Sequence, residues 1–274
     1  MSIKAVLIDF DGTCLQKDQI YLSLKNMHAI RKALEAGVLV IPCTGRAADM
    51  FPPQIEKEKG IRYWVSSAGA RVLDRQENRV VSECVFTPEE SAALCRLFEG
   101  RNIYAEVCAQ GKIHVEKTVF DHIWDFRIPG HHVWYIEDGR VKPIEKLSEY
   151  FLENRIGMEK ANIYGLTPDE AAWLQSEIRA LDIAWIPKPN TNSVQFFPKR
   201  LDKKTAVEAL LKQLSIDWSE VMAIGDADLD RCVVEAAGIG VAVANAKPEL
   251  LEVSDYVVAS DEMNGLAEAF ERFL

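Results

Sequence analysis

Short apolar runs that stop abruptly at acidic or small polar residues are the feature that most constrains the fold of this 274-residue chain. The run at residues 5–8 ends at Asp9, the run at 38–41 ends before Pro-Cys-Thr-Gly, and the run at 221–224 ends at Gly-Asp. Uninterrupted apolar runs of this length are typical of strands that are buried on both faces of a parallel sheet. The pattern predicts an α/β protein whose polar groups follow the carboxyl ends of its strands.

In the segments between these runs, apolar residues recur at the spacing of a helix. Residues 24–34 carry one such stripe, with Ser23 as a candidate N-cap and Gly37 as a stop signal. The second half of the chain repeats this rhythm, with helical stripes at 206–214 and 229–236. It also has short candidate strands at 239–243 and 256–258, and a further strand is expected at 63–66. The order of elements predicts a doubly wound, mostly parallel, Rossmann-like sheet.

The middle of the chain has a different texture. A helix led by Pro88, a helix after residue 167, and strands near 103–107, 113–115, 183–186 and 193–197 follow no βαβ rhythm. We interpret this part as an α+β cap domain inserted into the sheet domain. The predicted division is 1–86 for the first part of the core, 87–190 for the cap and 191–274 for the second part of the core. His131 and His132 lie in an aromatic stretch and are expected on a strand, facing opposite sides.

Composition and charge exclude several classes of protein. Hydrophobic residues make up 48% of the chain and charged residues 27%, which excludes a disordered, collagen-like or coiled-coil chain. The net charge of −10 disfavours a nucleic-acid or anionic-membrane partner. We expect no transmembrane helix and no secretory signal, because no apolar run is long enough. Six irregularly spaced cysteines indicate reduced thiols, so the predicted location is the cytoplasm. The sequence does not predict an oligomeric state.

Three aspartates follow the ends of apolar runs and are candidates for one site. Asp9 and Asp11 stand two residues apart at a turn loosened by Gly12, and Asp226 follows Gly225. Carboxylates brought together at one sheet edge repel one another unless a cation lies among them. Oxygen ligands favour Mg²⁺ over zinc or copper. The sequence therefore predicts Mg²⁺ as the cofactor, with Asp9, Asp11 and Asp226 as its ligands.

Two further motifs could bind phosphate. Thr44 and Gly45 end the second strand, where a hydroxyl group and open backbone N–H groups can hold phosphate oxygens. Lys203 opens a helix that Asp202 caps, a position where a lysine opposes the helix dipole. Neighbouring carboxylates or a bound phosphate would offset that cost. Lys204 could play the same part, or be merely solvated.

Together these motifs resemble the haloacid-dehalogenase-like superfamily, and more closely its Cof-type phosphatases with a type IIB cap. The resemblance rests on Asp9-x-Asp11-Gly12-Thr13, Thr44-Gly45-Arg46, Lys203, Gly225-Asp226 with Asp230, and the segment 241–246. It implies that Asp9 is a nucleophile and metal ligand, and that Asp11 is an acid/base whose backbone carbonyl also binds the metal. Thr44 and Lys203 would hold the phosphoryl group. Asp226 would complete the metal site, and Asp230 would be a ligand or a partner of one.

The implied activity is a Mg²⁺-dependent phosphomonoesterase that hydrolyses a small phosphorylated metabolite, such as a sugar phosphate, through an aspartyl-phosphate. Three departures from the family pattern stand beside it: Ala68 where Asn is common, Lys204 where Gly is common, and Leu229 where Asn helps to anchor the lysine and phosphate. A phosphomutase of the same superfamily is an alternative. So is a weakly active or inactive protein that binds a phosphorylated metabolite.

Overall fold

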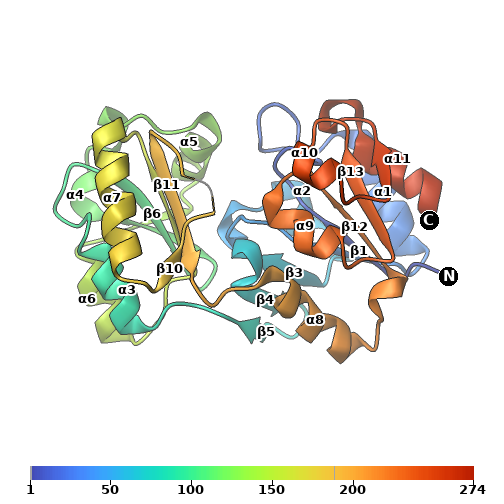
Figure 1. Ribbon diagram of the computed structural model, residues 1–274, viewed down its shortest axis with the longest axis horizontal. Helices are drawn as coiled ribbons and strands as arrows, with labels where there is room; N and C mark the ends of the chain where they lie inside the picture. The colour runs from blue at the N-terminus through green and yellow to red at the C-terminus, as the bar shows by residue number, and fades with distance from the viewer. Residues whose placement is uncertain (1, 188) are drawn as a thin grey trace. The chain divides into compact units, whose positions relative to one another are not determined.

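The computed structural model describes residues 2–187 and 189–274, and the chain divides into two compact units (Figure 1). Unit 1 consists of the chain up to Arg46, Phe51–Glu83 and Asp202–Leu274, and unit 2 consists of Ala47–Met50 and Cys84–Leu201. Unit 1 is therefore assembled from segments that lie on both sides of unit 2 in the sequence. None of the helices in the described residues combines the length and the apolar character needed to cross a membrane.

Unit 1 is built on a parallel sheet with the strand order β14-β13-β12-β1-β2. Its strands are β1 (Ala5–Ile8), β2 (Leu39–Pro42), β12 (Val221–Gly225), β13 (Ile239–Val243) and β14 (Tyr256–Val258). The side chains of β1 and β12 are buried throughout, as the uninterrupted apolar runs predicted. In register, Ile8 lies between Ile224 and Pro42. The residues that follow these three strands consequently emerge at the same edge of the sheet.

The strand order also explains how the helices of unit 1 are distributed. The chain moves from β1 to β2 in one direction and from β12 through β13 to β14 in the other. Because such crossovers are right-handed, α1 covers one face and α9 with α10 covers the other. The helices of unit 1 are α1 (Leu24–Glu35), α2 (Pro53–Lys57), α8 (Lys203–Leu214), α9 (Asp228–Val234), α10 (Pro248–Leu251), α11 (Gly265–Phe273) and the 3₁₀ turns η2 (Ser67–Gly69), η4 (Trp218–Glu220) and η5 (Asp261–Met263). The predicted doubly wound, mostly parallel fold is confirmed.

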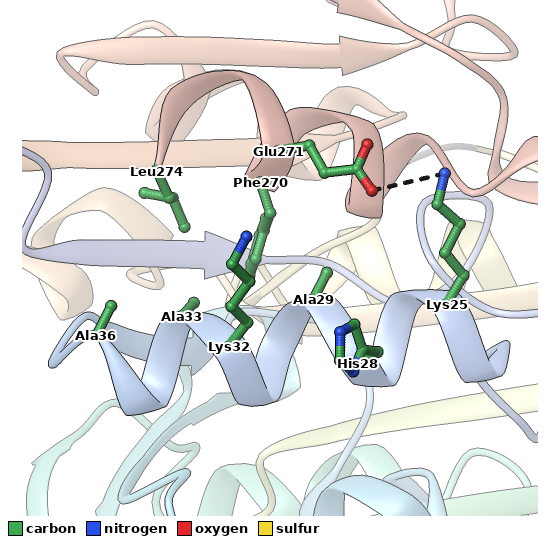
Figure 2. A pocket seen from close by; sticks show the side chains of 9 residues that line it. All are labelled: Lys25, His28, Ala29, Lys32, Ala33, Ala36, Phe270, Glu271 and Leu274. Carbon is green, nitrogen blue, oxygen red and sulfur yellow. Dashed lines mark ion pairs between the residues drawn. The ribbon is translucent and has the colours of Figure 1, made fainter.

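Helix α1 begins where the sequence predicted. The hydroxyl of Ser23 accepts a hydrogen bond from the N–H of Asn26 at 3.0 Å, which caps the helix. Helix α11 packs against α1, and a hollow of about 220 Å³ lies between them (Figure 2). Alanines of α1 face Phe270 and Leu274 there, and an ion pair joins Lys25 to Glu271 at the rim (Figure 2). None of the predicted site residues lines this hollow.

A small antiparallel sheet extends unit 1 beside β2. Its order is β3-β4-β5, and its strands are β3 (Tyr63–Ser66), β4 (Arg71–Asp74) and β5 (Arg79–Glu83). A parallel bridge between Cys43 and Val65 connects β3 to the end of β2. The sequence predicted β3 but not the hairpin that follows it. The turn η2 between β3 and β4 holds Ser67 and Ala68 at positive φ angles of 49° and 55°.

Unit 2 contains a mixed sheet with the order β10-β11-β9-β6-β7-β8. One face packs under α3, α6 and α7 (Figure 1). The other face carries Tyr104, Cys108 and the aromatic residues around α5. Its elements are η1 (Ala48–Met50), α3 (Pro88–Cys95), β6 (Tyr104–Ala109), β7 (Lys112–Glu116), α4 (Lys117–Phe120), η3 (Ile123–Asp125), α5 (Gly130–Glu137), β8 (Val141–Ile144), α6 (Leu147–Asn154), β9 (Lys160–Tyr164), α7 (Pro168–Ala180), β10 (Ala184–Trp185) and β11 (Ser193–Pro198).

One expectation for the middle of the chain is wrong, and one predicted boundary differs from the division into compact units. The segment with His131 and His132 is not a strand but the helix α5, and their rings lie 4.3 Å apart. Strand β11 pairs with β9 and β10, so it belongs to unit 2, although the predicted boundary at residue 190 places it with the core. The division into domains 1–86, 87–190 and 191–274 stays a prediction.

Candidate active site

Three buried or half-buried aspartates meet at the carboxyl edge of the sheet in unit 1. Asp9 follows β1, Asp226 follows β12, and Asp230 lies in the first turn of α9. One carboxylate oxygen from each lies within 4.8 Å of the others, and Asp9 and Asp230 are only 8% and 3% exposed. The sequence predicted Asp9 and Asp226 together, and it placed Asp230 as a ligand or a partner of one. The geometry brings all three into one acidic cluster.

The loop after β1 fits closely over Asp226. Gly12 has a φ of +72°, and a Cβ atom there would lie 2.6 Å from Oδ2 of Asp226, so only glycine fits this turn. Thr13 donates from its hydroxyl to Oδ1 of Asp226 at 3.1 Å. On the other side of the loop, the amide of Asn245 donates to the carbonyl of Gly12 at 2.7 Å. Thr13 and Asn245 were quoted in the family motifs without a role, and their contacts fix the loop.

Lys203 joins the cluster from the start of α8. Its ammonium donates to Oδ1 of Asp230 at 2.8 Å, and both side chains are 4% exposed. The other oxygen of Asp230 accepts the backbone N–H groups of Asp226 and Ala227 at 3.2 and 3.3 Å. Burial lowers the pKa of Lys203, but the carboxylates of Asp230 and Asp9 together with the other nearby groups outweigh it, so the net pKa is raised. The lysine is therefore a fixed, buried positive charge beside Asp9.

One lysine does not balance three carboxylates. Burial and the charge of Asp230 raise the pKa of Asp9 well above its usual value, and the same two causes raise the pKa of Asp226 to about 7. A cation among these oxygens would remove the repulsion, and a set of carboxylates is the donor set that hard divalent cations prefer. The residues present thus fit a divalent metal ion.

Asp11 does not join this cluster in the structure. Its carboxylate, 44% exposed, is bound by the two-pronged guanidinium of Arg46, whose Nε donates to Oδ2 at 2.7 Å and whose second nitrogen donates to Oδ1. Arg46 also donates to the carbonyl of Gln19 at 2.7 Å, and its side chain is 6% exposed. The motif analysis gave Arg46 no role. A basic residue directly after Thr-Gly was the available signal.

The phosphate-binding candidates surround Lys203 and Asp230. Thr44 is buried at the end of β2, and its hydroxyl accepts the N–H of Arg46 at 3.3 Å. A Cβ atom on Gly45 would lie 3.4 Å from the side chain of Leu229, next to Asp230 in α9. A Cβ atom on Gly69 would lie 3.0 Å from the Cα of Lys203. The Thr-Gly loop and the turn η2 therefore lie against the two helices that carry the lysine and its partner.

The three departures from the family pattern have distinct surroundings. Ala68 is 2% exposed and adopts the left-handed conformation that Asn tolerates better than Ala. Lys204 points its ammonium to within 3.9 Å of Glu208 on the exposed side of α8. Leu229 is half-buried and packs toward Gly45. Asp230 holds the ammonium of Lys203, and the effect of Leu229 on phosphate binding stays a prediction.

Comparison with known proteins identifies the family of the chain. The family profile of haloacid dehalogenase-like hydrolases matches residues 6–270. The chain belongs to this family. A phosphoglycolate phosphatase of Methanobrevibacter smithii is 38% identical over 283 residues, covering 100% of both chains. Phosphatase YwpJ of Bacillus subtilis is 29% identical over 296 residues, covering 99% of this chain and 100% of its own.

A solved relative shows the same fold. The haloacid dehalogenase subclass IIB sugar phosphatase BT4131 superposes with a TM-score of 0.72 at 20% identity and covers 98% of each chain. The resemblance predicted from the motifs is therefore confirmed. So is the prediction that this chain is an enzyme, a phosphatase of the haloacid dehalogenase type.

Proposed function

We propose that this haloacid dehalogenase-type phosphatase is a Mg²⁺-dependent phosphomonoesterase that acts through an aspartyl-phosphate. The observation that carries the proposal is the acidic cluster of Asp9, Asp226 and Asp230 with the buried ammonium of Lys203 bound to Asp230 at 2.8 Å. Asp9 supplies an oxygen nucleophile, and Lys203 supplies positive charge beside it. Positioning and electrostatic stabilisation carry most of the catalysis of phosphoryl transfer.

The roles of the residues follow from this arrangement. An oxygen of Asp9 attacks the phosphorus of the substrate, a bond forms between them, and the ester P–O bond breaks. Asp11, when protonated, gives its proton to the leaving alkoxide. Asp11 then takes a proton from water as the water attacks phosphorus, and the bond between Asp9 and phosphorus breaks to release inorganic phosphate. Thr44, Gly45 and Lys203 hold the phosphoryl oxygens in both steps.

The metal would be held by carboxylate oxygens of Asp9 and Asp226 and, as the family resemblance implies, by the backbone carbonyl of Asp11. When bound, Mg²⁺ neutralises the negative charge that gathers on the phosphoryl group and its ligands. Asp230 has both oxygens engaged, by Lys203 and by the N–H groups of Asp226 and Ala227. We therefore assign Asp230 to positioning the lysine and the Asp226 loop.

The ion pair with Arg46 restricts when Asp11 can donate a proton. A carboxylate held by an arginine favours its ionised form, whereas proton donation to the leaving group needs the protonated form. We infer that Asp11 leaves Arg46, or shares it with the substrate, when the substrate binds. Arg46 then holds Asp11 away from the acidic cluster only while no phosphate ester is bound.

The substrate is proposed to be a small phosphorylated metabolite, with a sugar phosphate as the first class to test. The relatives support this range, since one is named a phosphoglycolate phosphatase and a solved one a sugar phosphatase. We further propose that unit 2 is the cap that selects the substrate. The predicted cytoplasmic location and the absence of nucleic-acid and membrane partners remain predictions from the composition.

Phosphate release from a panel of phosphorylated metabolites, with Mg²⁺ and with chelator, tests the proposal. We expect turnover that depends on Mg²⁺, that Asp9→Asn abolishes, and that Asp169→Asn leaves unchanged, since Asp169 is an exposed aspartate at the start of α7. Mass spectrometry of acid-quenched enzyme should find a phosphoryl group on the peptide that contains Asp9. Turnover by Asp9→Asn within tenfold of the unmodified enzyme would contradict the covalent role.

A further inference from the structure

Unit 2 contains a hollow that no step of the proposed mechanism uses. It has a volume of about 370 Å³ and lies between the residues before α5, the turn from β9 to α7, and the start of β11. Its polar lining is Arg127, Tyr164, Asn192 and Ser193, and its apolar lining includes Ile128 and Leu166. Among the described residues no acidic side chain lines it. The volume is at the lower end of the range for pockets that bind small molecules.

Three of the polar side chains in this hollow have no side-chain partner in the part of the chain that the structure describes. Arg127, Asn192 and Ser193 make no side-chain hydrogen bond or ion pair to any residue within 2–187 and 189–274. A single exposed side chain without a partner is ordinary. Here three residues that carry a guanidinium, an amide and a hydroxyl line one hollow, and the backbone beside them is tightly packed. Gly165 has a φ of +71° and lies close to the backbone of Arg127. A Cβ atom on Gly165 would lie only 3.3 Å from the carbonyl oxygen of Arg127.

The fourth polar side chain, Tyr164, is oriented by a buried chain of hydrogen bonds. Its hydroxyl lies 3.1 Å from Nε2 of His132, and Nδ1 of His132 lies 2.7 Å from Oε2 of Glu106. Tyr104 donates to the other oxygen of Glu106 at 2.6 Å. Glu106 is fully buried and His132 is 4% exposed. A carboxylate, an imidazole and a phenol in series are a costly arrangement to bury, and this one ends at the wall of the hollow.

The ionisation of Glu106 fixes the direction of these bonds. Burial raises the pKa of Glu106, but His132, Tyr104 and Lys160 outweigh it, and the net pKa is lowered. An ionised carboxylate only accepts, so Nδ1 of His132 carries a proton. The hydrogen bond between His132 and the hydroxyl of Tyr164 therefore fixes the orientation of that phenol.

We propose that this hollow is a binding subsite for a small polyhydroxylated carboxylate or phosphate. Arg127 binds the oxyanion through its planar fork. Tyr164, Ser193 and Asn192 bind the hydroxyl groups, each of which offers a donor and an acceptor. Glu106 and His132 are positioning residues, which act on the ligand only through Tyr164.

Titration calorimetry on the full-length chain, without divalent metal, tests the subsite with gluconate and sorbitol as a pair that differs in the carboxylate. We expect gluconate to bind more tightly than sorbitol. Arg127→Gln should weaken gluconate binding by roughly tenfold to a hundredfold, the effect of losing a hydrogen bond to a charged group, and Tyr164→Phe by roughly twofold to tenfold, the effect of losing a neutral one. Arg96→Gln, at an exposed arginine that ends α3, should leave binding unchanged. Melting temperatures confirm that each variant is folded.

Kinetics with a second pair of ligands distinguish whether the bound anion is part of the substrate or a separate metabolite. This part of the test rests on the proposed function. If the hollow binds part of the substrate, Arg127→Gln raises KM for 6-phosphogluconate and leaves KM for sorbitol 6-phosphate unchanged. If it binds a separate metabolite, the variant weakens gluconate binding and changes neither KM.

The proposed subsite is contradicted if gluconate binds no more tightly than sorbitol. It is also contradicted if Arg127→Gln and Tyr164→Phe bind gluconate as tightly as the unmodified chain does. This result is independent of catalysis, because gluconate carries no phosphoryl group. An enzyme that hydrolyses neither sugar phosphate but binds gluconate through Arg127 would contradict the proposed function for these substrates and leave the subsite standing.

Discussion

Asp230 holds Lys203 with one carboxylate oxygen and the loop of Asp226 with the other. The ammonium lies 2.8 Å from Oδ1, and Oδ2 accepts the N–H groups of Asp226 and Ala227 at 3.2 and 3.3 Å. Gly225 makes this approach possible, since a Cβ atom there would lie 2.5 Å from the Cβ of Asp230. One buried side chain thus sets the distance between the positive charge and the acidic cluster.

Replacing Asp230 with Asn should therefore reduce both stability and activity. The amide keeps the shape of the carboxylate but leaves the ammonium of Lys203 buried without its counter-charge. Breaking a buried pair on one side costs about 3–5 kcal/mol. We expect a lower melting temperature and a kcat that falls more than KM rises. Asp228→Asn, at an exposed position in the same turn, is the control. A variant as stable as the unmodified enzyme would show that Asp230 does not balance Lys203.

The sequence predicted the fold of unit 1 because each strand there is buried on both faces. Such strands appear as uninterrupted apolar runs, and the polar residues that follow them stand out. Asp9 and Asp226 could be placed together for this reason alone. The hairpin of β4 and β5 was missed because β5 is largely exposed or half-buried and lacks such a run. In unit 2, β9 begins with Lys160 and carries Asn162, and both polar side chains are buried, so this strand does not appear in the sequence as an uninterrupted apolar run.

The sequence could not predict which charged side chains of the site pair with each other. Arg46 and Asp11 are 35 positions apart, and Lys203 and Asp230 are 27 apart. Their pairing depends on how β1, β2, α8 and α9 meet at one sheet edge. A motif shows which residue types are present, but the choice among several acidic partners for one cation is made by packing.

Leu229→Asn should bring no gain in kcat/KM. The family pattern alone predicts that this substitution raises kcat/KM, because the restored Asn would supply a polar anchor for Lys203. In the structure Asp230 already supplies that anchor, and Leu229 packs toward Gly45. We expect kcat/KM within about threefold of the unmodified enzyme and a melting temperature lowered by the loss of apolar burial. A tenfold rise in kcat/KM at matched Mg²⁺ and pH would show that the anchor is incomplete.

Acid should destabilise unit 2 through Glu106. Its pKa is lowered in the folded chain, so the unfolded chain binds its proton first as the pH falls. The stability from this group is present above the unfolded pKa, near 4.5, and is lost as the pH falls through the folded value. Melting temperatures measured from pH 6 to pH 3 should fall less steeply for Glu106→Gln than for the unmodified chain. The exposed Glu153→Gln should keep the original slope. Equal slopes for all three chains would exclude Glu106 as a source of the acid sensitivity.

Asp11→Asn should impair the hydrolysis of alkyl phosphates far more than that of 4-nitrophenyl phosphate. A nitrophenolate leaves without a proton, whereas an alkoxide needs one, and general acid catalysis contributes roughly 10²–10⁴-fold. The substitution also removes the charge that Arg46 binds, so its effect on stability must be separated from its effect on chemistry. Arg46→Gln provides that control, because it breaks the same pair and leaves the carboxyl group. We compare kcat/KM for the two substrates with each variant, because kcat/KM reports the step that releases the leaving group, whereas kcat also includes the later attack of water in which Asp11 acts as a base. An equal loss of kcat/KM for both leaving groups would show that Asp11 does not act as the acid in the first step.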